Sequence, residues 1–187
     1  MKADRIIELN MEELVLKMLW VNVLLLVLFA AAFHVFAQPF SFRPSWGGIL
    51  YFLAGYVVLI VLHELFHLIG FVVFGKVTVS SLQYGINLKM GIAYATTRTP
   101  VQNKAMKKAL LLPFWTTAVL PTIVGFWLDS QVLVLLGAML TAGAMGDFVM
   151  YRGLLKERNS AWIVDDPEKP KLHIYDLYPE PQKSTET

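Results

Sequence analysis

The sequence has 187 residues, which is enough for one domain of ordinary size. Hydrophobic residues make up 56% of it and the mean hydropathy is +0.55, which excludes a typical soluble domain and indicates an integral membrane protein. A net charge of +2 gives no sign of nucleic-acid binding, and the absence of cysteine excludes disulfides and thiolate metal sites.

Four apolar segments are each long enough to cross a bilayer as a helix, which takes about 20 residues. They run from about residue 18 to 37, 48 to 74, 109 to 128 and 131 to 151. A short amphipathic segment precedes the first, and the link between the third and fourth is so short that these two should pack as an antiparallel pair. The sequence therefore predicts an all-α polytopic membrane protein with four transmembrane helices.

Two other regions are expected to lie outside the membrane. Residues 77–97, between the second and third helices, are rich in β-branched and aromatic residues, which predicts a small β-rich insertion at the cytoplasmic face. Residues 156–187 are expected to be partly extended and then disordered. We therefore divide the chain into a membrane-embedded domain, residues 1–155, and a cytoplasmic tail.

Lysine and arginine are distributed unevenly along the chain. Three precede the first helix, six lie in the middle loop and six in the tail, against one in the first loop and none in the third. Cytoplasmic loops carry an excess of these residues, so both termini and the middle loop are predicted to be cytoplasmic. An even number of helices agrees with this. We expect a multi-pass protein of the cell membrane, in contact with its lipids.

The second apolar segment contains the sequence HELFH, residues 63–67, a His-Glu-x-x-His motif. His63 and His67 are four residues apart, so on a helix both imidazoles lie on one face and can hold one metal ion. Glu64 can reach a water at that ion without being a ligand, as a general base requires. A charge at bilayer depth costs at least ~2.5–3.5 kcal/mol, which favours a functional site over a chance match.

Asp147 is the candidate for a third ligand, because catalytic zinc usually has three protein ligands and the only acids in the predicted helices are Asp147 and Glu64. At 1.5 Å per residue, Asp147 lies roughly 7 Å and His67 roughly 13 Å from the inner ends of their helices, a difference that tilt can close. Gly143 and Gly146 allow close approach to a neighbouring helix. The alternative is that Asp147 is a hydrogen-bonded polar residue near the interface.

Two other histidines fit the cluster less well. His34 lies at the outer end of the first helix, and we interpret it as an interfacial histidine. His173 lies in the tail, and we interpret it as an ordinary tail residue, although the tail could fold back towards the site.

Several segments of the chain together resemble a known family. HELFHLIGFVVFGK, the strand-rich GIAYATT, the segment TPVQNKAMKKALLLPF and a late Gly-Asp pair are similar to the bacterial zincin-type membrane peptidases, first defined as a domain of unknown function. The resemblance covers about residues 45–155. More distantly, the chain is similar to intramembrane metalloproteases of the site-2 protease type, although their Asn and Pro upstream of an Asp-Gly pair are not reproduced. The resemblance implies His63, His67 and Asp147 as zinc ligands and Glu64 as the base.

We therefore expect a zinc-dependent peptidase that cleaves membrane-associated polypeptides within or beside the membrane. Two other classes stay open. A non-catalytic membrane adaptor with a retained metal site would keep its function in Glu64→Gln. A metal-handling or small-molecule transport protein would need a polar path across the whole bilayer, and the outer halves of the predicted helices lack such residues apart from His34.

Overall fold

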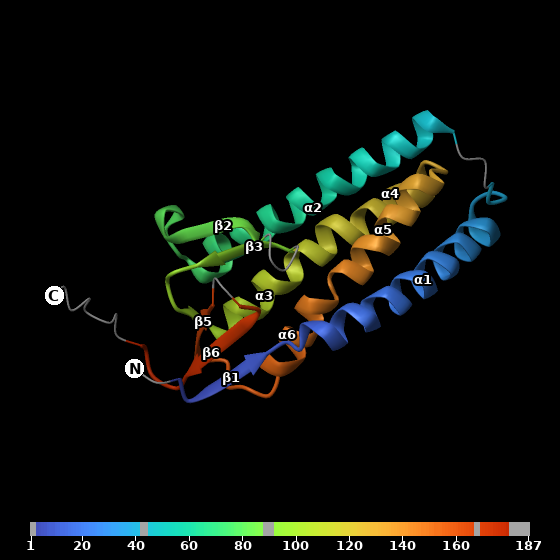
Figure 1. Ribbon diagram of the computed structural model, residues 1–187. Helices are drawn as coiled ribbons and strands as arrows, with labels where there is room; N and C mark the ends of the chain where they lie inside the picture. Colours follow the sequence, from blue (N-terminus) through green and yellow to red (C-terminus); the bar gives the residue numbers. More distant parts are fainter. Residues whose placement is uncertain (1–2, 42–44, 88–91, 167–168, 180–187) are drawn as a thin grey trace.

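Helices form an elongated bundle, and two small sheets gather at one of its ends (Figure 1). The computed structural model describes residues 3–41, 45–87, 92–166 and 169–179. The helices are α1 (Met11–Phe36), α2 (Trp46–Gly75), α3 (Asn103–Pro113), α4 (Leu120–Trp127), α5 (Gln131–Gly143) and α6 (Met145–Leu154). A 3-10 turn, η1 (Val79–Ser81), follows α2, and a π-helical stretch, η2 (Phe114–Val119), joins α3 to α4.

Three helical stretches of the described chain are long and apolar enough to cross a membrane: α1, α2 and the run from Asn103 to Trp127. A fourth is added if the bent pair α5 and α6 counts as one. Both α1 and the third run begin before the predicted residues 18 and 109, because hydropathy marks only the apolar part of a helix. In α1 the polar first turn is helical as well, with the Asn10 side chain accepting a hydrogen bond from the Glu13 amide.

The predicted fourth segment, residues 131–151, is divided into two helices. The axes of α5 and α6 differ by 44°, and the break falls at Ala144, directly after Gly143. Glycine in a helix loses more conformational entropy than alanine and weakens it locally. The bend places Asp147 in the first turn of α6 rather than in the middle of a straight helix.

The third run is helical throughout but changes its hydrogen-bond pattern after Pro113. Proline has no amide hydrogen and its ring disturbs the preceding turn, which explains a local departure from α-helical geometry. The hydroxyl of Thr117 donates to the Pro113 carbonyl at 2.8 Å within this stretch. Single π-helical turns are frequent at functional sites, and η2 contacts α2 in this structure.

Two antiparallel sheets depart from an all-α fold. The strands expected in residues 77–97 are present as a hairpin of β2 (Leu82–Asn87) and β3 (Ile92–Thr97). The other sheet was not predicted and has the order β1-β6-β5-β4. It is built from β1 (Arg5–Glu8), β4 (Val101–Gln102), β5 (Trp162–Asp165) and β6 (Lys171–Tyr175).

The four-stranded sheet joins the two ends of the chain. Arg5 pairs with Ile174 in the β1–β6 register, and its guanidinium binds Glu157 at 2.8 Å and Asp176 at 2.6 Å. The predicted amphipathic segment before α1 is therefore a strand, held by partners that lie more than 150 residues away. The tail contributes β5 and β6, and its expected disordered end lies largely outside the described residues.

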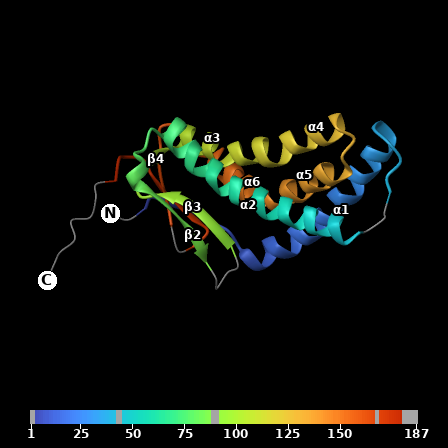
Figure 2. The ribbon, with the colours of Figure 1, turned by 90° about the horizontal axis from the view of Figure 1, so that it is seen from above.

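The largest cluster of buried apolar side chains lies where α2, α3 and α6 meet this sheet, and includes Phe71, Met106, Leu154 and Ile163. Figure 2 shows α3 and α4 following one another along α2, with the β2–β3 hairpin beside the C-terminal part of α2. By contrast, α1 and much of α2 leave their large apolar side chains exposed, as a surface in contact with lipid would require.

Candidate metal centre

Helix α2 holds the two histidines of the motif side by side. His63 is 9% exposed and His67 is 7% exposed. Their ring centroids are 5.0 Å apart and the rings are close to perpendicular, at 80°. The i, i+4 spacing predicted this shared face, and the helix is uninterrupted across it.

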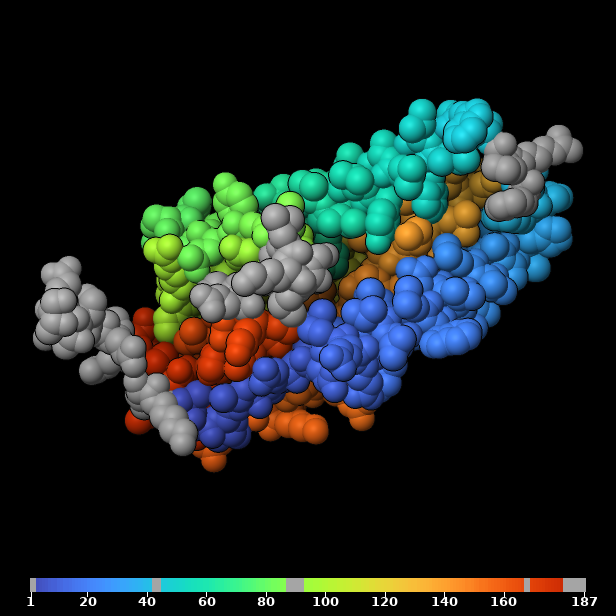
Figure 3. All heavy atoms as spheres, in the orientation of Figure 1, coloured from blue at the N-terminus to red at the C-terminus, as the bar shows by residue number. Residues whose placement is uncertain are grey.

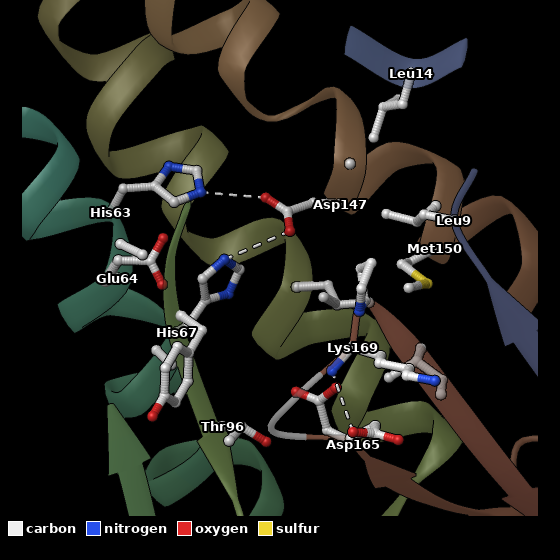
Figure 4. Close-up of a pocket in the computed structure, with 18 of the residues that line it drawn as sticks. Leu9, Leu14, His63, Glu64, His67, Thr96, Asp147, Met150, Asp165 and Lys169 are labelled. Carbon is white, nitrogen blue, oxygen red and sulfur yellow. Dashed lines mark hydrogen bonds and ion pairs between the residues drawn. The ribbon is translucent and has the colours of Figure 1, made fainter. Parts of the chain in front are cut away.

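Asp147 of α6 faces both imidazoles (Figure 4). One carboxylate oxygen lies 3.2 Å from Nε2 of His63, and the other lies 3.5 Å from Nε2 of His67. Ligand atoms of the three residues all lie within 4.8 Å of one another. Next to Asp147, Phe148 packs edge-on against Phe114 of η2 at 4.9 Å, which holds α6 against the third helical run.

The opposite nitrogen of each imidazole is held by the third helical run. Nδ1 of His63 lies 3.2 Å from the Thr117 hydroxyl, which already donates its hydrogen to Pro113 and can therefore only accept here. Nδ1 of His67 lies 3.2 Å from the Ala109 carbonyl, which is also an acceptor. Both Nδ1 atoms therefore carry a hydrogen, so the neutral imidazoles direct their Nε2 lone pairs towards Asp147. Partners of this kind fix the tautomer of metal-binding histidines.

This donor set fits a divalent cation. The neutral imidazoles direct two Nε2 lone pairs at carboxylate oxygens 3.2 and 3.5 Å away, an arrangement that is favourable only with protons on Nε2 or with a cation between the groups. One cation would satisfy all three groups at once. Two imidazoles and a carboxylate are ligands that zinc accepts, and they leave its fourth position open.

Glu64 follows the first histidine and is half-buried at the same cavity. Its carboxylate is turned towards the two imidazoles rather than away from them (Figure 4). The Glu64 carboxylate makes no hydrogen bond to the described residues, so nothing ties it to His63, His67 and Asp147. Glu64 is therefore placed beside the centre, where it can act on a bound molecule.

The cavity has a volume of about 400 Å³ and joins elements from the whole chain. Its apolar wall comes from the start of α1 and the preceding residues, with Leu9, Leu14 and Met18. Figure 3 shows α1 and α2 separated on one face, with atoms of α5 visible between them. Residues Ala93 to Thr96 of β3 form another wall.

Polar groups on the His67 side of the cavity come from β3 and β5 (Figure 4). Burial raises the pKa of Asp165 to about 7, an effect that the nearby Thr96 hydroxyl only partly offsets. The Thr96 hydroxyl is itself buried and has no hydrogen bond of ordinary geometry to the described residues. This end of the cavity thus offers polar groups to a bound molecule.

Of the sequence-based candidates, the structure brings together His63, His67, Asp147 and Glu64, whose chemical roles stay predictions. His34 lies at the other end of the bundle, where Nδ1 accepts the Phe40 amide at 3.1 Å. His173 lies in β6, 3.4 Å from Asp166. Sequence reasoning missed Thr117, Ala109 and Asp165. Only the TT pair after Pro113 could have drawn attention to the first of these.

Comparison with known proteins assigns this chain to a protein family. The family model described as "Putative zincin peptidase" matches residues 56–162, more than half of the chain, and this chain belongs to that family. The match contains the HELFH motif and Asp147, and it confirms the resemblance seen in the sequence. None of the curated proteins and none of the solved structures matches. The more distant likeness to site-2 proteases stays a prediction.

The centre depends on the close approach of α2 and α3 at Gly70. A Cβ atom there would lie 2.7 Å from the Ala109 Cα, and Ala109 supplies the carbonyl that orients His67. We expect Gly70→Ala to cost about 1–3 kcal/mol of stability, as overpacking does, and to lower zinc affinity. Thermal unfolding in detergent and zinc titration would measure both.

Gly47, in the same helix, is the matched control. Nothing lies within 4 Å of a Cβ atom at that position. Gly47→Ala should leave zinc affinity unchanged and add up to about 1 kcal/mol of stability through helix propensity. Equal behaviour of the two variants would contradict the role assigned to the contact at Gly70.

Proposed function

We propose that this protein is a zinc-dependent peptidase that cleaves membrane-associated polypeptides within or beside the membrane. The observation that carries the proposal is the convergence of two Nε2 lone pairs and the Asp147 carboxylate, with Glu64 beside them, in a cavity next to apolar helices. Membership of a zincin peptidase family supports the same chemistry.

His63, His67 and Asp147 would hold the zinc, which when bound supplies the Lewis acidity that polarises a scissile carbonyl and acidifies water. Glu64 then acts as the base. Its carboxylate takes a proton from the attacking water and delivers it to the nitrogen of the leaving amine. The Thr117 hydroxyl and the Ala109 carbonyl keep the imidazoles oriented throughout.

The substrate has to be extended at the scissile bond, because a helix hides its carbonyls in its own hydrogen bonds. Strand β3 pairs only with β2 among the described strands, and its residues Ala93 to Thr96 line the cavity beside the motif. We infer that the free edge of β3 binds the polypeptide as an added strand.

We further infer that four segments cross the membrane and that the sheets lie on the cytoplasmic side. Both sheets and the two ends of the described chain lie at one end of the bundle (Figure 1), and the described basic residues of the middle loop and tail belong to that end. The described residues of the α1–α2 and α4–α5 links lie at the opposite end, and the sequence of these two links contains one Lys or Arg in all, Arg43.

Metal content and cleavage, measured on the same preparations, test the proposed chemistry. We expect His67→Ala and Asp147→Ala to lose the zinc that the wild-type protein holds, because each removes one of three ligands. Glu64→Gln should keep the zinc and lower cleavage of a membrane-inserted polypeptide by about 10²–10⁴-fold, the usual contribution of a general base.

His34→Ala is the control histidine variant, since His34 lies at the other end of the bundle, and it should change neither zinc content nor cleavage. A wild-type protein without zinc would contradict the assigned centre. Full biological function in Glu64→Gln with zinc retained would identify an adaptor instead.

Proline substitutions test the edge of β3. The amides of Tyr94 and Ala95 point to opposite edges of the strand, so one of them faces β2 and the other points to the free edge. The proline at the free-edge position should lower cleavage and leave zinc content and thermal stability unchanged. The other should destabilise the hairpin. If neither variant alters cleavage at full zinc content, the substrate does not bind along β3.

The orientation can be tested with single cysteines, because the chain has none of its own. Ser41→Cys lies at the end with the α4–α5 link, and Ser80→Cys lies at the end with the hairpin; both positions are exposed. A membrane-impermeant maleimide should label Ser41→Cys in intact cells and Ser80→Cys only after permeabilisation. The reverse pattern would overturn the orientation.

A further inference from the structure

A second cavity, of about 480 Å³, lies on the face of α3 that is turned away from the metal centre. The N-terminal part of the cavity is lined by Lys104, Lys107 and Lys108. The part that follows along the same helical face is lined by Leu111, Leu112 and Trp115. These positions follow helical spacing, whereas Ala105, Met106, Ala109 and Leu110 form the buried face of the helix. We call this cavity the α3 pocket.

Among the described residues, no carboxylate balances the positive charge of the α3 pocket. No Asp or Glu of the described chain lines the pocket, and none of its three lysines forms an ion pair with a described acid. Arg5, in contrast, binds two carboxylates. A cluster of unbalanced ammonium groups attracts an anion.

Two of the lysines are held in place by neutral neighbours. Lys107 Nζ donates to the Asn159 side-chain oxygen at 2.7 Å, and Lys108 Nζ lies 5.7 Å from the ring centre of Phe74. Neither contact removes the charge, and the lysine keeps donors for a ligand. The ammonium groups are therefore positioned in advance of binding.

The lining of the pocket changes from lysines to apolar side chains along a helical run that is able to cross a membrane. Eleven residues separate Lys104 from Trp115, or roughly 16 Å at 1.5 Å per residue. Trp115 is 59% exposed, and an exposed tryptophan on such a helix faces lipid. A ligand that fills this pocket has an anionic head and an apolar body.

We propose that the α3 pocket binds an anionic phospholipid, with its phosphate on Lys104, Lys107 and Lys108 and its acyl chains over Leu111, Leu112 and Trp115. Charge complementarity and the apolar part of the pocket favour this occupant over an acidic peptide or a nucleic acid, which have no acyl chains to cover Leu111, Leu112 and Trp115. The proposal uses none of the residues of the metal centre and stands independently of peptidase activity.

The test uses the full chain in nanodiscs of phosphatidylcholine, with and without phosphatidylglycerol, and native mass spectrometry to count the lipids that stay bound. We expect phosphatidylglycerol to be retained in preference to phosphatidylcholine. Replacing the three lysines together by Gln should weaken retention by about a hundredfold, because each lysine near a charged headgroup contributes roughly a factor of five. Replacing them by Arg should preserve it.

The matched control is the triple variant Lys17→Gln, Arg98→Gln and Lys156→Gln, which removes the same charge elsewhere and should retain the lipid. Equal loss in both triples would overturn the site in favour of diffuse surface charge. Displacement of the lipid by inorganic phosphate alone would overturn it in favour of a simple anion site.

Brominated phosphatidylglycerol gives a second measurement that does not depend on the folding of the triple variant. It should quench tryptophan fluorescence of the wild-type protein more than that of Trp115→Phe, and brominated phosphatidylcholine, which reaches Trp115 only as bulk lipid, should show a smaller difference. Equal quenching of both proteins by both lipids would overturn the placement of the acyl chains at Trp115.

Discussion

The Nε2 atoms of His63 and His67 face one carboxylate, Asp147, inside a bundle of otherwise apolar helices. Polar groups at such a position are costly unless each lone pair finds a partner. The rest of the molecule supplies the means to hold them. Helix α2 sets the spacing of the imidazoles, the third helical run fixes their hydrogens, and the break between α5 and α6 directs the carboxylate to them.

The sequence predicted the parts of this centre that depend on helical periodicity. The spacing of His63 and His67 settles their shared face once α2 is a helix, and Asp147 could be chosen because acids are rare in apolar segments. Thr117 and the Ala109 carbonyl could not be found in this way. Thr117 depends on a π-helical stretch and leaves only the TT pair after Pro113 as a sign in the sequence, and the Ala109 carbonyl is a main-chain atom with no sequence pattern at all.

The same distinction between local and long-range features applies to the prediction of the fold. Hydropathy located the apolar segments and composition located the β2–β3 hairpin, because both signals are local. The sheet of β1, β6, β5 and β4 depends on pairing between segments far apart, and strands of two to five residues carry too little pattern to predict it. The 44° bend at Ala144 was missed for a related reason, since alanine and glycine leave the hydropathy of residues 131–151 unbroken.

The pairing of β1 with β6 has a consequence for biosynthesis. Strand β1 precedes every helix, and the strand that pairs with it, from Lys171 to Tyr175, is synthesised after all of the helices. Until then, Leu9 and the start of α1 have no sheet to anchor them, and Asp165 has no neighbouring β6. A nascent chain can insert its helices and bring the histidines together early. The cavity around them acquires its remaining walls only after β5 and β6 have been made, later than all of the helices.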